Sequence, residues 1–164
     1  MKNLLGLAVL FAACTAAFAE DKEKKDDKPL ATIHTGHYEK NKSGLKGDKS
    51  FLYFDSLEAF EKVFGTTPPL MGGGRKPNPV TKETFEKNIV VAVITRADAM
   101  TTYSEVSAKD DGGTLKVDYK AETEKPGTAT FAAPLILTVP AGKIKKVEFK
   151  ENGKDAGKAE KESK

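Results

Sequence analysis

The segment IVVAVIT at residues 89–95 is apolar at nearly every position and shows no alternation between apolar and polar residues. A strand that is covered on both faces has this pattern, whereas a strand with one solvated face alternates with a period of two. We therefore expect residues 89–95 to form a central strand of a sheet. Residues 114–120 do alternate, with Leu115, Val117 and Tyr119 on one face and charged residues on the other, which predicts a strand with a single buried face.

Turn residues divide the rest of the second half of the chain into short strands. The sequence DDGG at residues 110–113 is a strong turn signal, and residues 140–143 predict a hairpin that joins the last two strands. Pro134 lies within an apolar segment, where it indicates a bulge or an edge position. We therefore expect this half of the chain to be an antiparallel β-meander. The further strands predicted by apolar or alternating segments are residues 31–38, 51–54, 103–108, 128–139 and 144–149.

The hydrophobic period changes to that of a helix between residues 55 and 65. Asp55 is the expected N-cap, with Glu58 three positions later as the partner of a capping box. Gly65 is expected to end the helix in the left-handed conformation, and residues 81–87 to form a further helical turn. One early helix and an antiparallel sheet of six or seven strands place the chain in the α+β class. The residues that share the apolar face of the helix are Leu57, Phe60, Val63 and Phe64.

The N-terminal residues have the order of an export signal, in which a basic start precedes an apolar core and a small-residue cleavage site. Residues 4–18 carry no charge and are too few, at 15, to span a bilayer as a helix, which takes about 20 residues. The sequence Ala-Phe-Ala at 17–19 fits the cleavage site. We therefore expect residues 1–19 to be a signal peptide and the mature protein to be exported, to the periplasm, the cell envelope or the extracellular medium.

Cys14 allows a second interpretation of the same segment, because bacterial lipoprotein signals place an acylated cysteine after a short apolar stretch. Acylation would make residues 15–30 a tether and is the one route by which we expect the protein to be held at a membrane. Cys14 is also the only cysteine of the chain. The mature domain is therefore expected to hold no disulfide and no cysteine-ligated zinc.

Two segments rich in charges of both signs flank the apolar part of the chain. Residues 20–28 contain no apolar residue, and residues 151–164 contain none larger than alanine. Such segments cannot bury enough apolar surface to offset the entropy lost on ordering. The sequence thus predicts a disordered leader at 20–29, a single domain at 30–150 and a disordered tail at 151–164. The formal net charge of the 164 residues is only +3, so we expect no nucleic-acid partner.

The two histidines of the chain, His34 and His37, stand three positions apart in a predicted strand. Residues at this spacing point to opposite faces of a strand, so the two rings are not expected to share a metal ion. We expect two partly exposed strand residues and neither a metal nor a cofactor. A small metal-dependent or hydrolytic enzyme that uses His34 and His37 remains the alternative.

Two loops are the candidate contacts to a partner. Residues 66–79 contain four prolines and three glycines, and the glycines are followed by prolines rather than by the helix that a phosphate-binding loop requires. The second loop is expected at residues 96–103. Apolar and charged side chains at exposed loops favour a role in interaction. The expected contact residues are Leu70, Met71, Arg75, Arg96, Met100 and Tyr103.

The order of motifs in the second half resembles the C-terminal domain of protease-complex accessory proteins of the PrcB type. The segments that carry the resemblance are residues 88–94, 102–106, 111–117, 126–127, 133–135 and 146–149. The resemblance covers about residues 31–150 and implies a non-catalytic, exported domain that binds or stabilises a partner protein, such as a protease. It supplies no catalytic residues. A weaker resemblance to chagasin-like protease inhibitors rests on residues 101–103, expected in a loop between strands.

These patterns favour an exported, non-catalytic domain that binds another exported protein, with a protease as one class of partner. The enzyme that uses His34 and His37 and the chagasin-like inhibitor are alternatives, and a structural envelope protein without a specific ligand is a third. The catalytic constellations that would favour an enzyme more strongly, such as a serine in a Gly-x-Ser-x-Gly turn, are absent from the sequence.

Overall fold

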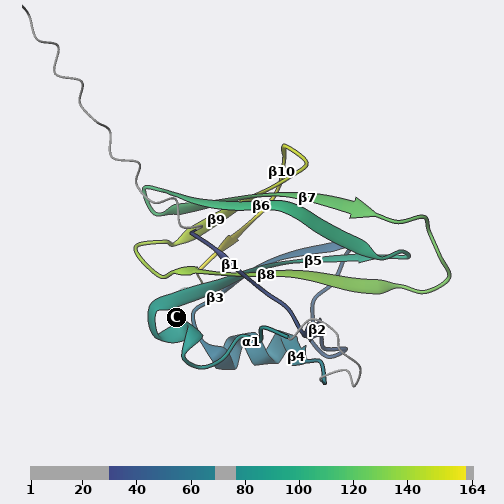
Figure 1. Ribbon diagram of the computed structural model, residues 1–164, viewed down its shortest axis with the longest axis horizontal. Coiled ribbons are helices and arrows are strands. Elements are labelled where there is room, and N and C mark those ends of the chain that lie inside the picture. Colours follow the sequence, from purple (N-terminus) through teal and green to yellow (C-terminus); the bar gives the residue numbers. More distant parts are fainter. Residues whose placement is uncertain (1–29, 69–76, 162–164) are drawn as a thin grey trace, which may run out of the picture.

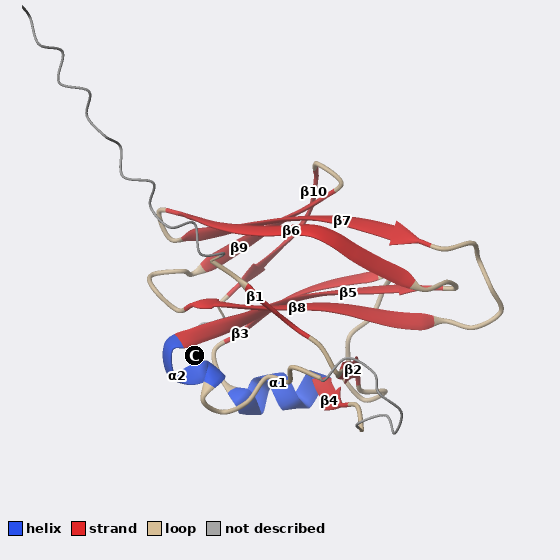
Figure 2. Cartoon of the chain, in the orientation of Figure 1, coloured by secondary structure: helices blue, strands red, loops and turns tan. Residues whose placement is uncertain are grey.

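Ten strands and two short helices make up the residues that the computed structural model describes, which are 30–68 and 77–161 (Figure 2). The expected signal peptide at 1–19, the leader at 20–29 and Cys14 lie outside these residues. The elements in chain order are β1 (Thr32–His34), β2 (His37–Glu39), β3 (Lys49–Phe54), α1 (Leu57–Val63), β4 (Phe64–Thr66), α2 (Thr84–Lys87), β5 (Asn88–Ala97), β6 (Thr101–Asp111), β7 (Thr114–Thr123), β8 (Phe131–Pro140), β9 (Lys146–Glu151) and β10 (Lys154–Glu160).

The strands form two four-stranded sheets that face each other, with α1 on the outer side of one of them (Figure 1). The first sheet has the order β1-β8-β5-β3, the second has the order β10-β9-β7-β6, and β2 pairs with β4 in a separate ribbon. The fold is therefore mainly β, with ten strands among the described residues rather than the six or seven expected. The three strands β1, β2 and β4 have three residues each, which is too short to produce a hydrophobic period.

The prediction that residues 89–95 form a central strand is confirmed. β5 pairs with β3 on one edge and with β8 on the other. Alternate residues of β5 enter two different cores, one between the two sheets and one between the first sheet and α1. Both faces of β5 are therefore dry, which is why the segment lacks alternation. The residues that enter the inter-sheet core are Ile89, Val91 and Val93, and those beneath α1 are Val90, Ala92 and Ile94.

The expected hairpin between β8 and β9 is wrong, and so is the meander. β8 lies in the first sheet between β1 and β5, whereas β9 lies in the second sheet, antiparallel to β10 and parallel to β7. Residues 135–139 are all buried, so both faces of β8 are covered by other parts of the protein. An interior position in the first sheet, between β1 and β5, gives β8 this burial and a hydrogen-bonding partner on each edge. The chain then crosses between the sheets, where Ile144 is buried in the inter-sheet core. β1 pairs only with residues 136–138 of β8, so Pro134 has no neighbouring strand on that side. Pro134 therefore lies at an edge of the sheet, and the pairing of β8 with β5 shows no bulge there.

Helix α1 forms where its apolar period predicts, but both expected end signals are wrong. Ser56 is the N-cap, and its side chain accepts a hydrogen bond from the backbone N–H of Ala59 at 3.4 Å. Gly65 does not adopt a left-handed conformation, because the chain passes directly into β4. Its lack of a side chain serves the Tyr38 ring, since a β-carbon at position 65 would lie 2.5 Å from that ring.

The expected disordered tail at 151–164 is wrong over the residues described. Lys154–Glu160 forms β10, which pairs antiparallel with β9 and reaches the inter-sheet core through Ala159. The small residues of this segment fit beneath large neighbours, since the ring of Phe51 on β3 lies against Gly157 and also 5.2 Å from the ring of Phe149. Phe51 therefore covers a strand that has no large apolar side chain of its own.

Candidate functional site

Two of the four exposed large apolar side chains among the described residues lie at the end of the molecule where β5 turns into β6. Met100 is 50% exposed and Phe131 is 40% exposed, although both are large and apolar. Phe131 begins β8 opposite Ala97 at the end of β5, and Met100 lies in the turn between β5 and β6, so both residues lie at the same end of these strands. The exposed large apolar residues among those described are Ile33, Tyr38, Met100 and Phe131.

The backbone at this end is fixed by hydrogen bonds between two loops. The N–H of Gly127 donates to the carbonyl oxygen of Asp98 at 2.7 Å, and that of Glu124 donates to the carbonyl oxygen of Met100 at 3.0 Å. Ala99, between the two acceptors, is buried. Residues 98–100 and 124–131 therefore form one bonded surface, which we call the tip.

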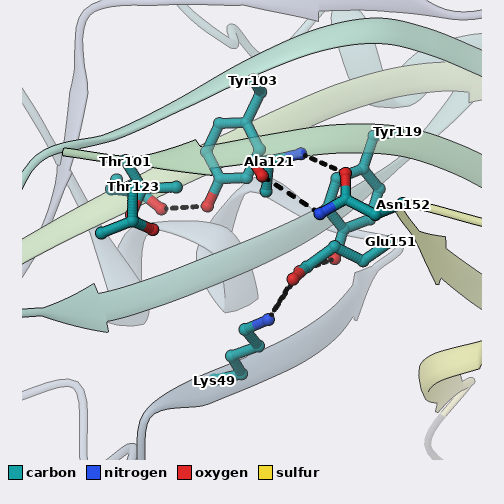
Figure 3. Close-up of polar contacts among 9 residues, drawn as sticks. Lys49, Thr101, Tyr103, Tyr119, Ala121, Thr123, Glu151 and Asn152 are labelled. Carbon is teal, nitrogen blue, oxygen red and sulfur yellow. Dashed lines mark hydrogen bonds and ion pairs between the residues drawn. The ribbon is translucent and has the colours of Figure 1, made fainter. Parts of the chain in front are cut away.

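A set of polar contacts at the same end of the strands joins the two sheets behind the tip (Figure 3). The hydroxyls of Thr101 and Thr123 lie 3.1 Å apart at the start of β6 and the end of β7. The Tyr103 hydroxyl donates to the carbonyl oxygen of Ala133 at 2.8 Å, which bonds the second sheet to the first. Its ring meets that of Tyr119 edge to face at 5.8 Å. These contacts hold β6 and β8, from which the tip projects, in one position.

Lys49, Tyr119 and Glu151 form the charged part of this set (Figure 3). The Lys49 Nζ lies 2.5 and 2.6 Å from the two carboxylate oxygens of Glu151, and the Tyr119 hydroxyl donates to the Glu151 Oε2 at 3.1 Å. Burial raises the pKa of Tyr119 strongly, and the Glu151 carboxylate raises it further. Tyr119 is therefore a permanent hydrogen-bond donor, and the cluster links β3 of the first sheet to β7 and β9 of the second.

The expectation that Arg96 is free for a partner is wrong. Its guanidinium group binds the Glu39 carboxylate through two hydrogen bonds of 2.8 and 2.6 Å, and also donates to the Gly47 carbonyl oxygen at 2.9 Å and the Ser50 hydroxyl at 3.0 Å. Only 16% of the Arg96 side chain and 9% of the Glu39 side chain is exposed. Burial alone raises the pKa of Glu39, but hydrogen bonds from Arg96 and Ser43 outweigh it and the pKa is lowered. Arg96 thus fixes the 40–48 loop onto β5.

The other expected contact residues have mixed outcomes. Residues 101–103 belong to β6 and not to a loop, which corrects the basis of the chagasin-like resemblance. Tyr103 is half-buried and its hydroxyl donates a hydrogen bond to the carbonyl oxygen of Ala133. It therefore supports the tip and is not part of its exposed surface. Met100 is exposed on the tip, as expected for a contact residue. Leu70, Met71 and Arg75 lie outside the described residues.

His34 and His37 are partly buried, and each ring has both nitrogens engaged with a different part of the fold. The Nδ1 of His34 lies 3.0 Å from the carbonyl oxygen of Asn78, and its Nε2 lies 2.5 Å from the Thr138 hydroxyl. The His37 ring lies between the Gly65 carbonyl oxygen and the N–H of residue 80. Within residues 30–68 and 77–161, no three His, Cys, Asp or Glu side chains gather into a group that could hold a metal ion.

A groove of about 680 Å³ runs along the outer edge of β3, between α1 and β10. Its charged rim includes Asp55, paired with Lys161 at 3.2 Å, and Glu58, paired with Lys62 at 3.1 Å. None of the four exposed large apolar side chains named above lines this groove. The tip is therefore the stronger candidate for a contact surface.

Comparison of the chain with protein-family models, with curated proteins and with solved structures finds no match. The resemblance to the accessory domain accordingly stays a prediction. No helix of the described residues combines the length and the apolar character needed to cross a bilayer.

Sequence reasoning did not find Phe131. An aromatic residue at the start of an apolar strand has the same local pattern whether it is buried or exposed. The polar, glycine-containing segment at 124–130 was the available signal that the strand starts at an exposed loop.

Proposed function

We propose that this protein is an exported, non-catalytic binding module that holds another exported protein through its tip. The observation that carries the proposal is the exposure of Met100 and Phe131 on a surface whose backbone is held by hydrogen bonds. Aromatic residues and methionine are enriched at protein interfaces, and a backbone that is already held in place avoids the entropy cost of ordering a loop on binding.

The arrangement of polar groups favours binding over catalysis. His34 and His37, on which an enzyme would depend, each have both ring nitrogens engaged by backbone or hydroxyl groups of the fold. Arg96 and Tyr103, at the same end as the tip, are also committed to internal partners. Within the tip, the exposed Met100 and Phe131 lie in segments that also carry the exposed charged residues Asp98, Glu124 and Lys125, so a partner would meet apolar anchors together with charged groups.

The resemblance to protease-complex accessory domains makes an exported protease one class of partner, and inhibition of that protease is the alternative outcome of the same contact. The tip suits a partner with a complementary apolar depression, because Met100 is exposed in the turn between β5 and β6 and Phe131 is exposed at the start of β8. Membrane attachment is a separate question, since it rests on acylation of Cys14.

Replacing both tip residues tests the proposal. The bait is the full mature chain carrying Met100→Ser and Phe131→Ser, with Ile33→Ser as the matched control because Ile33 is 47% exposed on β1. Capture of the partner from the native envelope or medium, measured by quantitative mass spectrometry, should fall by more than about tenfold in the tip variant alone. Equal capture by the tip variant, at an unchanged melting temperature, would rule out the tip as the contact.

The enzyme alternative has its own test. Stoichiometric metal in the full mature chain, or a hydrolytic activity that His34→Ala abolishes while the fold is retained, would favour the enzyme over the binding module.

A further inference from the structure

Residues 35–37, at the corner between β1 and β2, are bonded to a segment more than forty positions away. The N–H of Thr35 donates to the carbonyl oxygen of Asn78 at 3.1 Å, and the N–H of Asn78 donates to the Thr35 hydroxyl at 3.2 Å. Gly36 has a φ of +83°, and a β-carbon there would lie 2.6 Å from Pro77. The corner and residues 77–80 are therefore in close contact along their length.

His37 completes this contact in only one protonation state. Its Nε2 accepts a hydrogen bond from the backbone N–H of Val80 at 2.9 Å, so that nitrogen carries no hydrogen. Its Nδ1 faces the carbonyl oxygen of Gly65 at 3.3 Å and therefore donates. A proton added to Nε2 would place two donors against each other, and the amide hydrogen of Val80 cannot turn away. The contact with Val80 thus requires a neutral imidazole.

His34 differs from His37 because its partner can adapt. The Nδ1 of His34 donates to the Asn78 carbonyl oxygen, and its Nε2 faces the hydroxyl of Thr138. A hydroxyl donates to a neutral imidazole and, after rotation, accepts from a charged one. Protonation of His34 therefore keeps both of its hydrogen bonds, whereas protonation of His37 breaks one.

The described residues that contact the two rings supply no charge that would favour an imidazolium. Against His37 lie the Phe60 ring of α1, edge to face at 5.0 Å, and the backbones of β4 and residue 80. Against His34 lie Thr138 of β8 and the 78–79 backbone. Burial lowers the pKa of both histidines, and His34 lowers the pKa of His37 further. Among the described residues, the one charged group that acts on the pKa of His37 is His34.

We propose that His37 is the acid-sensitive element of a latch, which holds residues 77–80 on β2 when neutral and releases them when protonated. In the closed form the pKa of His37 lies below the ordinary histidine value of 6.5, chiefly because the ring is buried. The latch is therefore complete above pH 6.5 and weakens as the pH falls below that value. Release frees Val80, which is otherwise buried beneath α1. The latch is independent of the tip and goes beyond the proposed function.

Amide hydrogen exchange of the full mature chain between pH 7.5 and pH 4.5, corrected for intrinsic rates, tests the latch. Protection of the Val80 amide should fall by up to about tenfold per pH unit below the released-state pKa, until the pKa of the closed form is reached. The amide of Val91, in the middle of β5, should keep its protection. Nitrogen chemical shifts of the His37 ring should show a hydrogen on Nδ1 at pH 7.5 and titrate together with the Val80 amide.

Two variants separate His37 from other acid effects. His37→Gln offers a side-chain oxygen that accepts from Val80 at any pH, so the acid loss of protection should disappear. His34→Gln is the matched control and should retain the loss. Constant Val80 protection in the wild type down to pH 4.5, or an acid loss that persists in His37→Gln, would overturn the proposal. If His37→Gln does not fold, the wild type alone tests the proposal, because the His37 ring and the protection of the Val80 amide must titrate together.

Discussion

The ring of Phe51 lies on the backbone of Gly157, so closely that a β-carbon at position 157 would fall 2.3 Å from two ring atoms. Phe51 comes from the edge strand of the first sheet and Gly157 from the edge strand of the second. This contact closes one side of the space between the sheets, and it explains how β10 is held without a large apolar residue of its own.

Gly157→Ala should lower the free energy of unfolding by about 1–3 kcal/mol, because the new methyl group displaces the Phe51 ring from a filled core. Urea denaturation measures the change. In a Phe51→Leu background the same substitution should cost clearly less, since the smaller side chain leaves room. Equal costs in the two backgrounds would show that the ring does not rest on Gly157.

Truncation after Glu151 should destabilise the domain, although the sequence beyond it has the composition of a tail. Loss of residues 152–164 removes the β9–β10 ladder and exposes the core next to Ala159. We expect the free energy of unfolding to fall by about 3 kcal/mol or more. A thermal melt unchanged by the truncation would contradict the placement of β10.

Glu39→Gln should cost about 3–5 kcal/mol at pH 7, because it leaves the Arg96 guanidinium partly buried without its counter-charge. The folded-state pKa of Glu39 lies below its ordinary value of 4.5, so the wild type carries this stability above pH 4.5 and loses it as the pH falls. Urea denaturation should therefore show a smaller difference between wild type and Glu39→Gln at pH 3 than at pH 7. A difference independent of pH would show that the pair is not ionic.

Tyr119→Phe should lower the free energy of unfolding by about 1.5–3 kcal/mol, since it removes a hydrogen bond to the Glu151 carboxylate while keeping the ring. In a Glu151→Gln background the cost should be smaller, because the acceptor is then neutral. Chemical denaturation of the wild type, the two single variants and the double variant gives the coupling energy between Tyr119 and Glu151. A coupling energy of zero would show that their hydrogen bond does not stabilise the fold.

Local patterns predicted the parts of the fold whose burial is complete. β5 and α1 were found because each buries whole faces, which imposes a clear period on the sequence. β10 was missed because its small residues are covered by Phe51, which lies more than a hundred positions earlier. The crossing from β8 to β9 was missed because strand pairing across sheets depends on contacts that no local pattern records.

The candidate site was predictable only in part for the same reason. Met100 was singled out from its place in a turn, and that turn is exposed. Arg96 was assigned the wrong role because its partner, Glu39, is 57 positions away along the chain. Tyr103 was placed at the boundary between a predicted loop, 96–103, and a predicted strand, 103–108, and the structure extends the strand back to Thr101.

Site-specific photo-crosslinking tests most directly the proposal that the tip binds another exported protein. A photoreactive residue is placed at Met100, at Phe131 or at Ile33 in the full chain, and each protein is illuminated in its native compartment. We expect one and the same partner to be crosslinked from positions 100 and 131 and not from position 33. The claim is contradicted if positions 100 and 131 give no adduct, or if position 33 gives the same adduct as they do.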